Sequence, residues 1–122
     1  MKFRILIAED DPSIQEIFTI ILERAGYEVQ ISPDGRNIFE KGVPHLFILD
    51  KQLSGINGLD VCRNLKSDAA TRDIPVIMIS ATPGIEVLAI EAGANDYLEK
   101  PFSVRALLEK VEKYLTRELR SA

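Results

Sequence analysis

The sequence predicts an α/β domain in which helices cover both faces of a parallel sheet. Short, continuous apolar runs, typical of strands buried on both faces, recur along the chain. Segments with apolar residues at helical spacing separate these runs, and such alternation indicates a parallel sheet. The length of 122 residues suits a single domain over residues 1–122, with a core from about residue 3 to 118.

Five strands are expected to alternate with five helices. The strands are predicted at residues 3–8, 27–32, 45–50, 75–80 and 96–100. The helices are predicted at residues 12–25, 36–42, 58–67, 85–92 and 104–115, the second being at most a short one. Because crossovers between parallel strands are right-handed, few topologies remain. A flavodoxin-like (βα)5 sandwich of three layers, with strand order 2-1-3-4-5, suits this length.

Local signals support the individual elements. The first helix is predicted to have Asp11 as its N-cap and Pro12 at its first position, and Gly26 is expected to end it. The residues of the second strand alternate in the way that is typical of a strand with one face closer to water. The turn residues 33–35 follow this strand. The stretch SGINGLD after the third strand is predicted to be a loop, and Ser103 is expected to cap the last helix.

Composition narrows the class of protein. The net charge is -4 with a pI near 5.0, and the absence of a clustered basic stripe predicts no direct nucleic-acid binding. The single cysteine, Cys62, excludes an intrachain disulfide and fits a reducing compartment, and we expect it in the core. Apolar runs are too short for a membrane span or a signal peptide. A cytoplasmic protein without membrane contact is therefore expected.

Polar side chains stand where the predicted strands end. Ligand sites in open parallel sheets lie beyond the carboxyl ends of the strands, so these residues are expected at one rim. They are Glu9, Asp10 and Asp11 after the first strand, Asp50 after the third, Ser80 after the fourth and Lys100 after the fifth.

This set of side chains has a chemical logic. Clustered carboxylates repel one another unless a cation lies among them, and oxygen ligands of this kind suit Mg²⁺. A carboxylate can also act as a nucleophile and form an aspartyl-phosphate, whose oxygens a cation, a lysine and a hydroxyl would neutralise. Asp50 is the candidate acceptor. Each residue alone also has an ordinary explanation, such as helix capping or surface exposure, and His45 is expected to be structural or exposed.

Four motifs in this order and spacing resemble the receiver domain of bacterial two-component response regulators. The motifs are ILIAEDD followed by DPS, FILD followed by a loop with Asn-Gly, PVIMISA, and AGANDYLEKPF. The resemblance implies that Asp50 accepts a phosphoryl group from a phosphohistidine of a sensor histidine kinase or phosphotransfer protein in a phosphorelay. It also implies that Mg²⁺ is held by Glu9, Asp10, Asp50 and the backbone carbonyl of Gln52.

The resemblance further implies a switch. Ser80 and Lys100 would contact the phosphoryl oxygens, and Tyr97 would change rotamer together with Ser80. The Lys100-Pro101 peptide bond is usually cis in the family. The surface of the fourth helix, fifth strand and fifth helix would signal to a downstream protein target or to an output domain missing from this chain. Such a domain is no enzyme in the usual sense, because it catalyses only its own phosphorylation and dephosphorylation.

Other functions fit the sequence less well. A haloacid-dehalogenase-like phosphatase would need an Asp-x-Asp pattern and a cap, and a flavin-binding module would need a phosphate loop without acids. A degenerate receiver that only binds proteins would have lost an acid or the lysine. Two departures from the family pattern stand near Asp50: Lys51 follows it directly, and Ser54 occupies the usual proline position.

Overall fold

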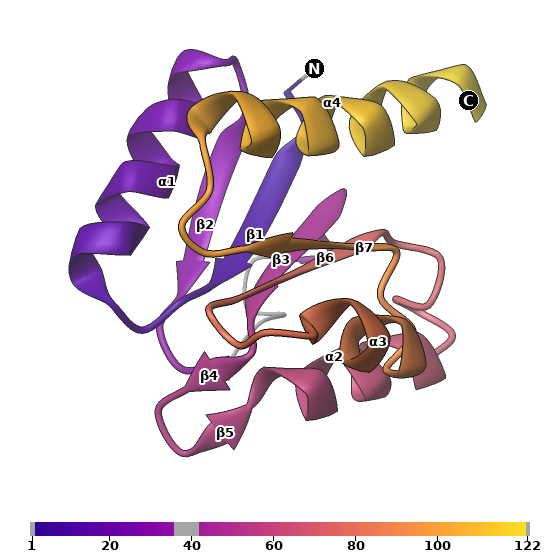
Figure 1. Ribbon diagram of the computed structural model, residues 1–122. Helices are drawn as coiled ribbons and strands as arrows, with labels where there is room; N and C mark the ends of the chain where they lie inside the picture. Colours follow the sequence, from indigo (N-terminus) through magenta and orange to yellow (C-terminus); the bar gives the residue numbers. More distant parts are fainter. Residues whose placement is uncertain (1, 36–41, 122) are drawn as a thin grey trace.

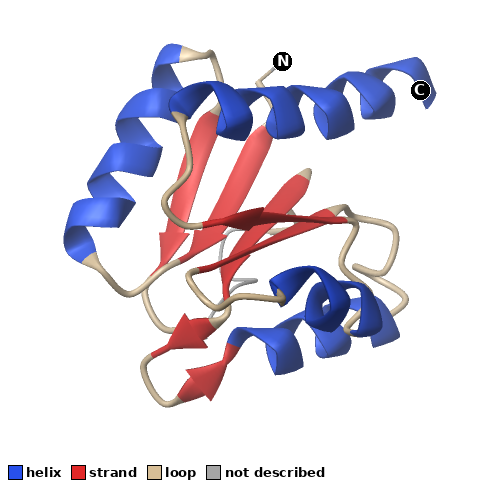
Figure 2. Ribbon diagram, in the orientation of Figure 1, coloured by secondary structure: helices blue, strands red, loops and turns tan. Residues whose placement is uncertain are grey.

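The computed structural model describes residues 2–35 and 42–121, and it contains a five-stranded parallel sheet (Figures 1 and 2). The strands of this sheet are β1 (Arg4–Ala8), β2 (Glu28–Ser32), β3 (Leu46–Asp50), β6 (Val76–Ser80) and β7 (Asp96–Glu99). Their order is β2-β1-β3-β6-β7. This is the predicted order 2-1-3-4-5 once the separate hairpin β4–β5 is left out of the count, so the predicted topology is confirmed.

Helices cover both faces of the sheet. Helices α1 (Pro12–Arg24) and α4 (Val104–Ser121) lie on one face, and α2 (Gly58–Ser67) and α3 (Ile85–Glu91) lie on the other (Figure 1). The short helix predicted at residues 36–42 falls almost entirely on 36–41, which lie outside the described residues. The sequence left open whether the tail after Leu115 would fray or extend the last helix, and in the structure α4 continues past Leu115 to Ser121. The residues that follow Leu115 include good helix formers.

Alternate residues of the central strands serve two separate cores. Ile5 and Ile7 of β1 pack with side chains from α1 and α4. Leu6 and Ala8, their neighbours in the same strand, pack with side chains from α2 and α3. All four are fully buried, as expected for a strand covered on both faces.

The capping signals act as predicted at the start of α1. The Asp11 carboxylate accepts a hydrogen bond from the Ser13 N–H at 2.8 Å, and Pro12 takes the first helical position. Helix α1 ends before Gly26, whose φ of +97° lies in the left-handed region that glycine tolerates.

The segment predicted to be a plain loop after β3 contains a small antiparallel hairpin. Strands β4 (Gln52–Leu53) and β5 (Ile56–Asn57) pair through a turn whose second residue, Gly55, has a φ of +73°. Leu53 is buried and anchors the hairpin in the core. The Asn57 side chain then caps α2 by accepting a hydrogen bond from the Leu59 N–H at 2.9 Å. The hairpin therefore lies fixed beside the carboxyl end of β3.

Candidate phosphoryl and metal site

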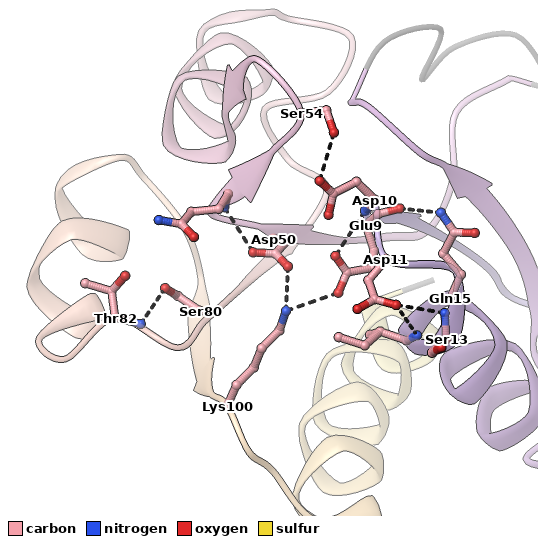
Figure 3. A network of polar contacts seen from close by, with 12 residues as sticks. Glu9, Asp10, Asp11, Ser13, Gln15, Asp50, Ser54, Ser80, Thr82 and Lys100 are labelled. Atoms are coloured by element: carbon pink, nitrogen blue, oxygen red, sulfur yellow. Dashed lines mark hydrogen bonds and ion pairs between the residues drawn. The ribbon is translucent and has the colours of Figure 1, made fainter.

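The carboxyl ends of β1, β3, β6 and the residue after β7 surround one cavity of about 280 Å³ (Figure 3). Every strand-end residue singled out from the sequence lines this cavity, together with Gln52 of the hairpin. The predicted residues found there are Glu9, Asp10, Asp11, Asp50, Gln52, Ser80 and Lys100. The parallel topology brings them together from distant parts of the chain.

Asp50 is held from two sides at the end of β3. Its side chain is only 7% exposed, and its Oδ2 atom lies 2.6 Å from the Nζ atom of Lys100. Its Oδ1 atom accepts a hydrogen bond from the Gln52 N–H at 3.0 Å. The carboxylate is thus oriented by a cation and by the backbone of the hairpin.

Glu9 is the second buried acid of the site. Its Oε1 atom lies 3.1 Å from Lys100 Nζ, and its Oε2 atom accepts the Asp10 N–H at 3.0 Å. Burial, and then the neighbouring Asp50 carboxylate, raise the pKa of Glu9 to about 7, although the Lys100 ammonium acts in the opposite direction. The backbone carbonyl of Glu9 accepts a 2.6 Å hydrogen bond from the Gln15 side chain, which ties the end of β1 to α1.

Lys100 bridges the two acids from the far side of the cavity. Burial alone lowers the pKa of Lys100, but its hydrogen bonds to Asp50 and Glu9 outweigh this and raise it above the usual value. The Lys100 N–H donates to the Ser80 carbonyl at 2.8 Å, and the following peptide bond to Pro101 is cis. The backbone hydrogen bond to Ser80 holds Lys100 at the position from which its side chain reaches the acids.

Asp10 has a partner that the sequence did not reveal. Its Oδ2 atom accepts a hydrogen bond from the Ser54 hydroxyl at 3.0 Å (Figure 3). Ser54 lies in the turn between β4 and β5, so the hairpin reaches across to the end of β1. The contact depends on the fold of the β4–β5 hairpin, which the sequence did not predict.

Ser80 is buried and turned toward its own loop. Its Oγ atom accepts a hydrogen bond from the Thr82 N–H at 2.9 Å, as Figure 3 shows. The side chain lines the same cavity as Asp50. The hydroxyl is therefore close to the site, while the loop after β6 holds it.

Tyr97 lies on β7, outside the set of residues that line the cavity. It pairs in register with Met78, two residues before Ser80 on the neighbouring strand. The Nζ atom of Lys110 lies 5.4 Å from the centre of its ring, and the nearby Glu86 carboxylate raises its pKa. Tyr97 thus faces charged groups of α3 and α4.

The carboxylates that line the cavity are suitable ligands for a hard cation, but they do not point at one common position. Among the residues that the structure describes, no three His, Cys, Asp or Glu side chains form a ready metal-binding group. The geometry gives a reason, because the Lys100 ammonium lies between Glu9 and Asp50 and keeps these two carboxylates paired with itself. Burial and, after it, the neighbouring Asp50 carboxylate raise the pKa of Glu9, and a divalent cation beside the two acids would favour their ionised forms.

Two other residues considered from the sequence are structural. The Nδ1 atom of His45 accepts the Arg4 N–H at 2.9 Å, and its ring packs edge-on against Phe3. Strands β1 and β3 both begin next to these residues, whereas the cavity lies at the ends of the strands. His45 therefore lies at the rim of the sheet opposite the cavity. Cys62 is fully buried in α2, where burial raises the pKa of its thiol.

Comparisons with known proteins identify the family. Residues 5–112 match the family model described as response regulator receiver domain. The chain is 41% identical over 119 residues to the DNA-binding dual master transcriptional regulator RpaA of Synechocystis, a match that covers 93% of this chain and 49% of that protein. It is 38% identical over 122 residues to the DNA-binding response regulator MtrA of Mycolicibacterium smegmatis, covering 96% of this chain and 52% of that protein. The chain belongs to the response regulator receiver domain family and spans about half the length of these relatives.

Solved structures agree with this assignment. A putative response regulator from Chloroflexus aurantiacus superimposes with a TM-score of 0.89 at 31% identity, covering 95% of this chain and 99% of that one. The receiver domain of a sensor histidine kinase from Pseudomonas aeruginosa superimposes with a TM-score of 0.85 at 26% identity, covering 95% and 99%. That structure has a magnesium ion coordinated in its active site cleft. The predicted class, a receiver domain of a two-component response regulator, is confirmed.

The relatives correct one prediction. The acidic composition led to the expectation of no direct nucleic-acid binding, yet both relatives are named as DNA-binding regulators. The expectation was wrong because the charge of a receiver domain carries no information about DNA binding by the regulators that contain one. Within the part of the chain that the structure describes, none of the helices is both long and apolar enough to cross a membrane.

Proposed function

We propose that this receiver domain is a phosphoacceptor switch in which Asp50 takes a phosphoryl group from a phosphohistidine of a sensor kinase or phosphotransfer protein. The observation that carries the proposal is the bridge from Lys100 to Asp50 and Glu9, at the carboxyl ends of separate strands. A nearly buried carboxylate held by a cation at the mouth of a cavity is poised to act as a nucleophile. A degenerate, binding-only receiver is not favoured, because the acids and the lysine all line one cavity.

The chemistry would be a transfer between two nucleophiles. An oxygen of Asp50 attacks phosphorus, and the bond from phosphorus to the histidine nitrogen breaks with its electron pair left on the imidazole. Glu9, Asp10, Asp50 and the Gln52 carbonyl would hold Mg²⁺, which when bound neutralises charge on the phosphoryl oxygens. Attack of water on the acyl phosphate later releases inorganic phosphate and restores the Asp50 carboxylate.

The switch would run through the loops after β6 and β7. A phosphoryl group adds charge and three strong acceptors beside Ser80 and Lys100. The Ser80 hydroxyl accepts a hydrogen bond from the Thr82 N–H and can donate its own O–H to a phosphoryl oxygen, so a movement of Ser80 toward the phosphoryl group would carry the loop after β6 with it. Movement of this loop would alter the space next to Tyr97 and thereby the surface formed by α3, β7 and α4.

The biological setting follows from this chemistry and from the relatives. The domain would be a cytoplasmic phosphoprotein that catalyses only its own phosphorylation and dephosphorylation. Because two relatives are named as DNA-binding regulators, we place the switch upstream of gene regulation. Its output would pass to a downstream protein or to a domain beyond this chain.

The switch can be tested with beryllofluoride, which mimics an acyl phosphate on a carboxylate. Amide NMR spectra of the wild type with Mg²⁺ should show large shifts for Ser80, Thr82 and Tyr97 when beryllofluoride is added. The Asp50→Asn variant, treated in the same way, should show none of these shifts. Equal shifts in both proteins, or shifts confined to residues away from the loops after β6 and β7, would contradict the proposal.

A further inference from the structure

The β4–β5 hairpin contacts both carboxylates that come from neighbouring strands. The Gln52 N–H of β4 donates to Asp50 Oδ1 at 3.0 Å, and the Ser54 hydroxyl in the turn donates to Asp10 Oδ2 at 3.0 Å. Figure 3 shows the Ser54 side chain directed at the carboxylate of Asp10. One short hairpin therefore orients two acids of the site.

The position of Ser54 is determined by the hairpin rather than by its own side chain. The pairs Gln52–Asn57 and Leu53–Ile56 leave only Ser54 and Gly55 in the turn. Leu53 is 7% exposed and is packed in the core. A turn with so few residues and so firm an anchor gives the Ser54 hydroxyl a narrow range of positions.

We infer that Ser54 is a positioning residue for Mg²⁺, acting through Asp10; this inference rests on the proposed function. A carboxylate has two oxygens, so the one that accepts from Ser54 restrains the rotation of the other. Hydrogen bonds to a metal-ligating carboxylate orient it and raise metal affinity. Through Ser54, the hairpin that carries the Gln52 carbonyl also sets the direction of the Asp10 side chain.

The expected effect is moderate because Ser54 is exposed and water competes for the Asp10 oxygen. A single hydrogen bond to a charged group at such a position corresponds to about a three- to tenfold change in Mg²⁺ affinity. Alanine removes the hydroxyl, whereas threonine keeps it. The pair of variants therefore separates the hydrogen bond from the mere presence of a different residue in the turn.

The test is isothermal titration calorimetry, in which Mg²⁺ is added without any phosphodonor. The proteins compared are the wild type, Ser54→Ala, Ser54→Thr and Asp10→Asn. We expect weaker binding by about three- to tenfold in Ser54→Ala, affinity near wild type in Ser54→Thr, and a larger loss in Asp10→Asn. The thermal midpoint of metal-free Ser54→Ala should stay close to that of the wild type.

The outcomes separate this inference from the proposed function. If the wild type binds Mg²⁺ and Ser54→Ala binds it equally well, the inference is wrong while the proposed metal site stands. An equal loss of Mg²⁺ affinity in the alanine and threonine variants would show that the turn, and not the hydroxyl, matters. A matching loss of thermal stability in Ser54→Ala without metal would show the same, and either result would overturn the inference. Failure of the wild type to bind Mg²⁺ would overturn both.

Discussion

The Nζ atom of Lys100 lies 2.6 Å from Asp50 Oδ2 and 3.1 Å from Glu9 Oε1, so two nearly buried acids share one ammonium group. The two acids come from the ends of β1 and β3, and the lysine follows β7. The Lys100 ammonium offsets much of the repulsion between the two carboxylates. The same geometry would make Lys100 available to a phosphoryl group on Asp50.

Replacement of Lys100 by methionine should destabilise the domain and make its stability more dependent on Mg²⁺. The variant leaves two buried acids without their cation, at a cost of about 2–3 kcal/mol in unfolding free energy at pH 7. This is less than for a fully buried pair, because the Lys100 side chain is 21% exposed. Added Mg²⁺ should raise the thermal midpoint of the variant more than that of the wild type.

Lys51→Met is the matched control, because Lys51 follows Asp50 directly but does not line the cavity. It should lose less than about 0.5 kcal/mol, as surface substitutions usually do. An equal loss in both variants would mean that the Lys100 bridge contributes nothing specific.

Replacement of Gly58 by alanine should disrupt the segment that follows Asp50. A Cβ atom at this position would lie 1.9 Å from the Asp50 carbonyl oxygen, a contact with backbone that cannot rotate away. The Gly58 N–H also donates to the Lys51 carbonyl at 2.7 Å. We expect a loss of roughly 2–3 kcal/mol in urea unfolding, typical of overpacking.

Gly55→Ala separates this clash from the effect of backbone conformation. Gly55 has a φ of +73°, but nothing lies within 4 Å of a Cβ placed there. Its substitution should cost about 1 kcal/mol through strain alone. A larger loss for Gly55→Ala than for Gly58→Ala would contradict the structure of this segment.

Asp96 should make stability depend on pH in the acid range. Burial by itself raises the pKa of Asp96, but hydrogen bonds from Lys110, the Tyr97 N–H and Tyr114 outweigh it and lower the pKa below the usual 3.8. A lowered pKa means that the ionised carboxylate stabilises the folded state. That contribution is present in full above pH 3.8 and is lost as pH falls through the folded-state pKa.

The Asp96→Asn variant should therefore be less stable than the wild type at pH 7, by about 1–2 kcal/mol, with the difference shrinking toward pH 2. Urea unfolding at several pH values measures this. Asp60→Asn serves as control, because Asp60 pairs with Arg63 on the exposed surface of α2 and should change stability little at any pH. A constant difference between wild type and Asp96→Asn across the range would refute the assigned role.

The fold could be predicted because its signals are local and repeated. Apolar runs such as 46–50 marked the central strands, and the Asp11-Pro12 pair marked the start of α1. The hairpin β4–β5 escaped prediction, because two-residue strands are too short to show a period in the sequence.

The gathering of the candidate site residues at one rim could be predicted, because the carboxyl ends of parallel strands lie at the same edge of the sheet. The contacts that orient the side chains could not. The bond from Ser54 to Asp10 depends on how a hairpin folds back over the sheet, across 44 positions of sequence. The bonds from Tyr114 to Asn95 and Asp96 likewise join a helix to a strand end that no local pattern connects.

The most direct test of the account is the intact mass of the protein after incubation with Mg²⁺ and a small phosphodonor such as acetyl phosphate. The wild type should gain one phosphoryl group, only when Mg²⁺ is present, and Asp50→Asn should gain none. A phosphoryl adduct of equal yield in Asp50→Asn, or none in a wild type shown to bind Mg²⁺, would contradict the role of Asp50 as the phosphoacceptor.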